Sequence, residues 1–486
     1  MAATLCLLAG CAAGPNYRRP DLAALSVPDT YAPSVTPPQA LAEEADIVAW
    51  WRHIDDPVLT DLIARATAGN LQIAQLVGRL AQAREALVQT RGDLLPSLSG
   101  SAGATRNFTR GGSSSIVIGG NNGTGGTIIT TGGSSGNTQL SLGLDASWQA
   151  DIFGGIRRSL QASRADEQAA RFDLEGVRTS VAGEVASNYI QARLAQARLD
   201  IARSTLRAQD DNLQIAGWRV QAGLVSSLDA EQARAQRAQT AATIPSLQTS
   251  YLQAVNRLAI LAGDAPGALR TEMEPIRPIP RGPEAIAVGI PADTLRRRPD
   301  VRGAERQLAA ATARVGVAEA ALLPALTISG NINTAAASIG NLGSLITGGL
   351  FAGITQTIFD AGRRKAQVRS ARAGVDIAFA TYRETVLTGL EEVENAAQAL
   401  SAARARQAEL AIALDASNNA AIYSRSQYRS GLIDFLTVLQ SEQSLLSARD
   451  QLASAGADQA LAVVRLYLAL GGGWQPAPSE PTEGPA

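Results

Sequence analysis

Histidine and cysteine are nearly absent from this chain of 486 residues, which has one histidine, His53, and two cysteines, Cys6 and Cys11. So few nitrogen and sulfur ligands argue against a Cys/His metal site and against a disulfide framework. A catalytic triad would need His53, which lies in the polar segment 51–56 with no nucleophile motif beside it. We therefore expect no catalytic residue, no metal site and no cofactor.

Long hydrophobic runs are also missing. No stretch reaches the roughly 18 uncharged apolar residues that a transmembrane helix needs. The formal net charge is −1, so there is no overall positive charge to attract nucleic acid. If such a chain crosses a membrane, it must do so as a closed β-barrel, because lipid offers no hydrogen bonds to exposed backbone groups.

The N-terminus has a short apolar run that ends in LAGC at 8–11. An apolar run, small residues and a cysteine are typical of a bacterial lipoprotein signal. We predict a signal peptide at 1–10, lipidation of Cys11 and a tether after it, and Ala12 after the cysteine resembles lipoproteins sorted to the outer membrane. The missing basic start of the signal predicts that translation begins upstream of Met1. A chance cysteine in an ordinary apolar N-terminus stays as the alternative.

Self-comparison of the sequence finds an internal repeat. The distance in sequence between matching segments is larger for the first match than for the later ones, because the first half carries extra residues in the run 111–136. This run is rich in Gly, Ser, Thr and Asn, which is typical of an exposed loop. The matches are LLPSL at 94–98 with LLPAL at 322–326, IFGGIRR at 152–158 with IFDAGRR at 358–364, GLV at 223–225 with GLI at 431–433, and 257–263 with 465–471.

Each half is predicted as helix, strand, loop, strand, helix, turn, helix. In both halves a very long helix follows the hairpin; the one at about 156–220 would measure about 95 Å at 1.5 Å per residue. Two shorter helices per half, stacked end to end, would match the long one in length and pack beside it as in a coiled coil. We predict repeat 1 at 58–263 with a hairpin at 97–151, a linker at 264–292, repeat 2 at 293–471 with a hairpin at 325–359, and a disordered tail at 472–486. The remaining predicted helices are at about 58–93, 228–261, 294–323, 363–428 and 435–470.

The second strand of the first hairpin alternates strictly between apolar and polar residues from Leu140 to Trp148. A terminal Trp148 on the apolar face is typical of an aromatic girdle at a membrane interface. A soluble sheet with one buried face is the alternative, but it would need an amphipathic cover, and the helices are committed elsewhere. Each half then supplies one unclosed sheet. Its open edges would be sealed only by sister chains, so three copies would give twelve strands.

The chain resembles the TolC-like outer-membrane factors, in the lipoprotein branch of NodT or OprM type. The resemblance covers nearly the whole chain, and it is carried by CAAGPNYRRP at 11–20, WW at 50–51, the two LLP elements, IFGG at 152–155 and RRRPDV at 296–301. It implies an α+β membrane protein, a homotrimer whose twelve-stranded outer-membrane β-barrel stands on a long periplasmic α-helical barrel. The segment 11–57 would comprise the lipidated tether and, near 27–56, part of an equatorial collar. The segment 264–292 and the C-terminus would complete this collar. The implied partners are outer-membrane lipid, a periplasmic adaptor protein and an inner-membrane pump of the resistance-nodulation-division type.

The turns between paired helices are the predicted adaptor contacts. Gly223 and Gly431 can adopt the left-handed conformation of a helix C-cap. In the family such tips meet the adaptor, and exposed apolar residues would then be available to it; the alternative is that Gly-Leu only caps and staples the helix. The predicted contact residues are Gly223, Leu224, Val225, Gly431, Leu432 and Ile433.

A gate would lie near these tips in the closed channel. The family places aspartate rings and polar links there, and no aspartate of this chain matches that gate position. An ordinary solvated face is the alternative for the candidates, which are Asp210, Asp211, Tyr423, Arg425 and Tyr428.

The predicted function is the outer-membrane exit duct of a tripartite efflux pump for drugs or small solutes. The outlet of a type I protein secretion system is the alternative within the family. A soluble periplasmic coiled-coil scaffold without a pore conflicts with the alternating strands, and an enzyme conflicts with the missing catalytic constellations.

Overall fold

The computed structural model describes residues 12–21, 23–31, 47–108, 115–116, 129–130, 136–283, 286 and 291–475. The predicted signal peptide, Cys11 and most of the Gly-rich run 111–136 therefore lie outside the described residues. The chain divides into two compact units, one of 1–17, 84–164 and 309–376 and the other of 18–83, 165–308 and 377–486. We call them the strand unit and the helix unit.

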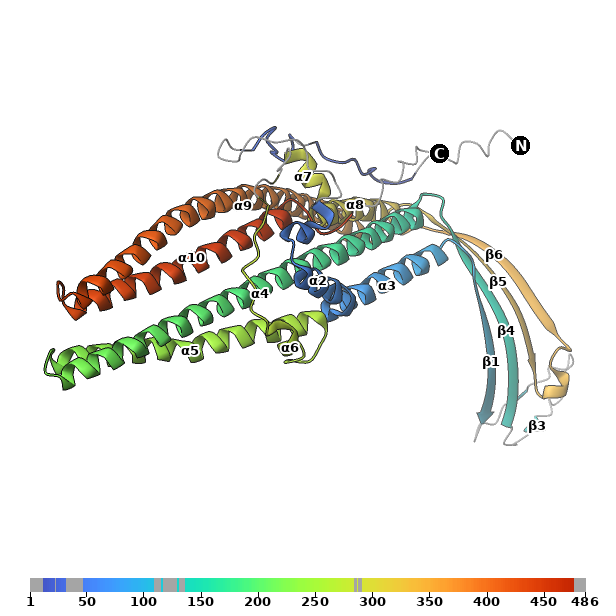
Figure 1. Ribbon diagram of the computed structural model, residues 1–486. Coiled ribbons are helices and arrows are strands. Elements are labelled where there is room, and N and C mark those ends of the chain that lie inside the picture. Colours follow the sequence, from blue (N-terminus) through green and yellow to red (C-terminus); the bar gives the residue numbers. More distant parts are fainter. Residues whose placement is uncertain are drawn as a thin grey trace, which may run out of the picture. The chain divides into compact units, whose positions relative to one another are not determined.

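The strand unit holds one antiparallel sheet of four strands in the order β1-β4-β5-β6 (Figure 1). The prediction of a separate sheet in each half is wrong, because the two hairpins join along β4 and β5, where Trp148 lies opposite Ile328 and Leu144 opposite Ile332. Strands with the same apolar and polar alternation can pair without turning an apolar side chain to the polar face. The strands are β1 (Ser97–Phe108), β4 (Gly136–Ala150), β5 (Ala325–Ala336) and β6 (Ile346–Thr355), and a short pair, β2 (Ser115–Ile116) with β3 (Ile129–Thr130), lies in the Gly-rich run.

The predicted alternation holds over most of the sheet, with Phe351 opposite Ser329 and Arg106 opposite Thr138 as exceptions. In register, Leu144, Ile332 and Leu350 belong to one face, and serine, threonine and asparagine dominate the other. The apolar face is exposed in the single chain, with Leu350 84% and Ile354 73% exposed. So much uncovered apolar surface is abnormal for a soluble protein and requires another apolar medium or partner.

Four long helices match their predicted bounds to within two residues. They are α4 (Gly155–Gln221) with α5 (Ser227–Ala262), and α9 (Arg363–Arg429) with α10 (Phe435–Ala469). Figure 1 shows α4 and α5 as one hairpin and α9 and α10 as another. In the described part of the chain, no helix is both long enough and apolar enough to span a membrane.

Two helices that the sequence predicts as continuous are broken. The first divides at Asn70 into α2 (Pro57–Gly69) and α3 (Leu71–Gly92). The other divides at Arg298 into α7 (Pro291–Arg297) and α8 (Pro299–Ala320), because the residue before a proline is disfavoured in the helical region. The other short helices of the described residues are η2 (Trp50–Ile54), α6 (Arg270–Met273) and η3 (Ile339–Asn341).

The core of the helix unit forms where the short helices meet the long ones. Trp50 is fully buried and stacks on Tyr467 of α10 at 5.8 Å between ring centroids. Trp474 is also buried and meets Phe172 of α4 edge to face, at 6.1 Å between the ring centroids. The predicted disordered tail at 472–486 therefore begins too early, since its first residues carry a packed tryptophan.

Asn70 explains the first break and leads to a stability prediction. Its Oδ1 accepts hydrogen bonds from the amides of Gln72 and Ile73, which caps α3, and its Nδ2 donates to the carbonyl of Leu261 at 2.9 Å. We expect Asn70→Ala to destabilise the protein by about 2 kcal/mol, because it removes a cap and leaves a buried carbonyl unpaired. Thermal unfolding of the purified protein measures this. Asn70→Ser keeps the cap but is too short to donate to Leu261, so it should lie between the wild type and alanine. An alanine variant that melts like the wild type contradicts the argument.

Candidate functional site: the helix-hairpin tips

The two turns that join the long helices have the same backbone structure. In the first, the amide of Leu224 donates to Arg219 at 2.9 Å and that of Gly223 donates to Val220 at 3.0 Å. Leu432 and Gly431 repeat both bonds with Gln427 and Tyr428 in the second turn, and both glycines have φ of 72°. These are the paired bonds of a Schellman C-cap, so the predicted capping role of both glycines is confirmed.

The next helices start with side-chain caps. Ser226 accepts a hydrogen bond from the amide of Leu228 at 3.2 Å, and Asp434 accepts one from the amide of Thr437 at 2.9 Å. Hydrogen bonds from the side chain and backbone of Thr437 lower the pKa of the exposed Asp434 carboxyl. Both turns are therefore held by local hydrogen bonds on either side, which presents their apolar residues in a defined geometry.

The leucines after the two glycines are strongly exposed. Leu224 is 72% and Leu432 is 74% exposed, while Val225 and Ile433 are half-buried. A Schellman cap is commonly accompanied by an apolar contact from the residue after the glycine back to the last turn of the helix. At the first turn that part of the helix offers the polar Arg219 and the apolar Trp218, and at the second turn it offers only polar residues. Stapling by the leucines stays an alternative prediction, and both leucines are largely exposed at the tips.

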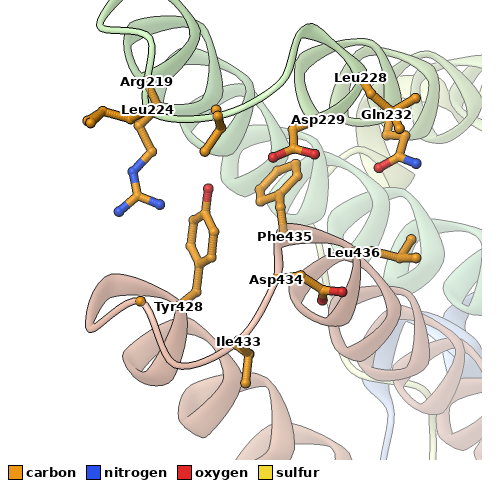
Figure 2. A pocket seen from close by; sticks show the side chains of 12 residues that line it. Arg219, Leu224, Leu228, Asp229, Gln232, Tyr428, Ile433, Asp434, Phe435 and Leu436 are labelled. Atoms are coloured by element: carbon orange, nitrogen blue, oxygen red, sulfur yellow. The ribbon is translucent and has the colours of Figure 1, made fainter.

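An aromatic cleft of about 550 Å³ lies between the two turns (Figure 2). The rings of Tyr428 and Phe435 lie 5.4 Å apart, and the Arg219 guanidinium lies 4.4 Å from the centre of the Tyr428 ring. Figure 2 shows both rings directed from the α9–α10 turn toward the α4–α5 turn. Phe435 also packs with Ala216 and Ala233 in a small core. The two hairpins are thus joined at their tips by aromatic and apolar contacts.

The predicted gate residues do not come together in one cluster. Asp210 pairs with Arg237 of α5 at 2.6 Å, and Asp211 is exposed. Tyr423 is 64% exposed, whereas Tyr428 is packed in the aromatic cleft. Their role in a gate remains a prediction.

The last candidate, Arg425, contacts a buried glutamate that the sequence does not single out. Arg425 donates to the carboxylate of Glu442 at 2.9 Å, and the Asn212 amide donates to both oxygens of that carboxylate at 2.8 and 2.7 Å. Glu442 lies on α10 and is 7% exposed, so this buried carboxylate links α4, α9 and α10. A single glutamate in a polar helix gives no sequence signal for such a role, because its partners lie on two other helices.

Comparison with known proteins gives the family. Residues 62–264 and 290–472 match the family model described as outer membrane efflux protein. The chain belongs to the outer membrane efflux protein family. It is 29% identical over 476 residues to nodulation protein T of Rhizobium leguminosarum bv. trifolii, covering 97% of this chain and 96% of that protein. It is 30% identical over 489 residues to the toluene efflux pump outer membrane protein TtgF of Pseudomonas putida, covering 98% and 96%.

Solved structures place this efflux family member in the predicted fold class. The outer-membrane channel OprN superposes with a TM-score of 0.83 at 34% identity, over 96% of this chain and 100% of that one. CusC superposes with a TM-score of 0.77 at 25% identity, over 95% and 100%. These neighbours are trimeric outer-membrane channels of the TolC-like class, so the predicted resemblance and α+β fold class are confirmed.

Trp148 lies close to the end of β4 in this family member. It is 37% exposed, and its indole nitrogen donates to the carbonyl of Leu94 at 3.0 Å. An amphipathic ring that is anchored by its polar edge suits a membrane interface, which stays a prediction. Among the described residues, no group of histidine, cysteine and carboxylate side chains is arranged to hold a metal ion.

Proposed function

We propose that this protein is the exit duct of a tripartite efflux pump, which passes drugs or small solutes from an inner-membrane pump to the exterior. Membership of the outer membrane efflux protein family carries the proposal. Curated relatives are described as outer-membrane components of toluene efflux and pyoverdine export, which are transport roles for small molecules.

The exposed sheet supports an assembly of three chains in the outer membrane. The order β1-β4-β5-β6 leaves β1 and β6 at the edges of the described sheet, and its apolar face has the exposure expected of a lipid-facing surface. Sister chains that pair with these edges would satisfy the backbone groups that lipid cannot. No catalytic step is part of this function.

The tips support the adaptor as the second partner. Leu224 and Leu432 are exposed apolar residues on capped turns, which makes them available for an apolar contact with a protein partner. A resistance-nodulation-division pump in the inner membrane would complete the pathway, with the periplasmic adaptor between it and these tips.

Gene deletion tests the proposed function. Cells that lack this chain should accumulate a fluorescent efflux dye and become sensitive to toxic solutes, and the wild-type chain should restore both. The outlet of a type I secretion system, the alternative, predicts instead that a secreted protein is retained while dye accumulation stays normal.

Lipidation of Cys11 is a separate prediction that follows from the LAGC sequence. Cys11→Ser removes the thiol that would carry the lipid. The variant should therefore incorporate no radiolabelled palmitate, whereas the wild type should. Cys6→Ser is the matched control, because Cys6 lies in the predicted signal and should leave with it. Equal labelling of the Cys11→Ser variant and the wild type would refute lipidation at this residue.

A further inference from the structure

The segment that follows Cys11 is docked in the strand unit, although its sequence predicts a tether there. The amide of Ala13 donates to the carbonyl of Phe153 at 2.9 Å. Phe153 lies just after the end of β4 and just before α4 begins. The chain is therefore held at the base of the sheet from its second described residue onward.

Arg158 of α4 holds this segment. Its side chain is 4% exposed, and its Nε donates to the carbonyl of Ala13 at 2.9 Å. Its Nη2 donates to the carbonyl of Gly14 at 3.0 Å and to Oδ1 of Asn16 at 2.8 Å. A planar guanidinium with several fixed donors suits such a row of acceptors, and a lysine ammonium does not. Gln161 accepts from Nη1 at 2.9 Å, which orients the fork.

A close backbone crossing seats the segment on its other side. Gly14 has φ of 85°, and a Cβ on it would lie 2.4 Å from Cα of Gly316 in α8. A Cβ on Gly316 would in turn lie 2.8 Å from the carbonyl oxygen of Ala13. Only glycine at both positions permits this approach. Arg158 of α4 and Gly316 of α8 therefore together determine where the segment lies.

We propose that Arg158 is a positioning residue for the lipid anchor, which rests on the proposed lipidation of Cys11. Cys11 directly precedes Ala12, and consecutive Cα atoms are about 3.8 Å apart. A lipid on Cys11 would therefore be attached next to the docked segment. Arg158 thereby ties the acyl chain to the end of β4 that carries Trp148. Lipid and sheet then enter the bilayer at a set relative height.

Docking of the segment restricts how far the lipid can move relative to the sheet. An undocked segment 12–16 would let the acyl group move by about 17 Å at roughly 3.4 Å per residue. A loose lipid brings the chain to the membrane but does not orient its sheet. A docked one also presents the sheet to the bilayer in one orientation, as a short, stiff linker does for a second binding event.

Hydrogen exchange tests the docking in the full-length protein. Arg158→Ala removes three charge-assisted bonds, so exchange at the Ala13 amide should rise by roughly ten- to a hundredfold. Arg158→Lys should lie between the two. Arg164→Ala, an exposed arginine on the same helix, is the matched control and should exchange like the wild type. Unchanged exchange in Arg158→Ala would overturn the docking role.

A double-mutant cycle tests the link to the lipid, with the fraction of chains assembled as trimers in the outer membrane as the readout. In acylated protein, Arg158→Ala should lower this fraction several-fold. In Cys11→Ser protein exported by a cleavable signal peptide, the same substitution should lower it no further. Equal losses in both backgrounds would mean that Arg158 only supports the fold, which overturns this inference and leaves the proposed exit duct intact.

A spacer gives an independent check. About six Gly-Ser residues inserted between Cys11 and Ala12 add about 20 Å of slack without touching the Arg158 contacts. This variant should keep the wild-type exchange at Ala13 and assemble as poorly as acylated Arg158→Ala. Wild-type assembly would overturn the inference, and a wild-type chain that incorporates no palmitate would overturn both it and the proposed lipidation.

Discussion

The double substitution of Leu224 and Leu432 by aspartate is expected to abolish transport while leaving the channel folded in the outer membrane. Both leucines are more than 70% exposed and stand on turns whose hydrogen bonds come from the backbone and from cap residues, so the fold does not depend on them. A carboxylate forced into an apolar contact with the adaptor costs several kcal/mol, and two would weaken binding by at least about a hundredfold.

The measurement is dye accumulation in cells, combined with cross-linking of the channel to its adaptor. Leu71→Asp is the matched control, because Leu71 is 67% exposed and lies in α3, away from both turns in the sequence. It should retain transport. If the double variant transports normally at wild-type levels in the outer membrane, the tips are not the adaptor contacts.

Arg298→Ala should produce the largest loss of stability, about 3 kcal/mol. Arg298 lies at the break between α7 and α8, is 7% exposed, and donates to Asp300 at 2.7 Å and Glu392 at 2.6 Å. It also donates to the carbonyl of Ala469 at the end of α10, at 2.9 Å. One side chain thus ties together three helices.

The expected loss of stability lies at the low end for a buried ion pair, because Asp300 and Glu392 are each about half exposed. Water can solvate both carboxylates once the guanidinium is removed. The carbonyl of Ala469 is buried, so water cannot replace its lost hydrogen bond, and this adds to the loss of stability. Thermal unfolding of the purified protein measures the loss. Arg296→Ala is the control, since Arg296 is exposed and its pair with Asp293 is expected to contribute at most about 1 kcal/mol. An Arg298→Ala variant as stable as this control would contradict the conclusion that Arg298 holds the three helices together.

Much of the local structure is determined by the sequence alone. The alternation from Leu140 to Trp148 requires a strand with one apolar face, because side chains alternate with a period of two. The absence of proline in 156–220 permits one long helix. Gly223 and Gly431 mark its end and that of its repeat, because a Schellman cap needs a residue at positive φ. All of these are short-range properties of the chain.

Tertiary structure decided what depends on partners far apart in the sequence. The hairpins joined into one sheet because β4 offered β5 a matching edge. The break at Asn70 needed the carbonyl of Leu261, and the buried position of Glu442 needed Asn212 and Arg425. Arg158 is one of many arginines until residues 13–16 meet it. A sequence pattern records the periodicity of a segment, whereas a hydrogen bond between distant residues exists only after packing has brought donor and acceptor together and removed the water that would otherwise satisfy both.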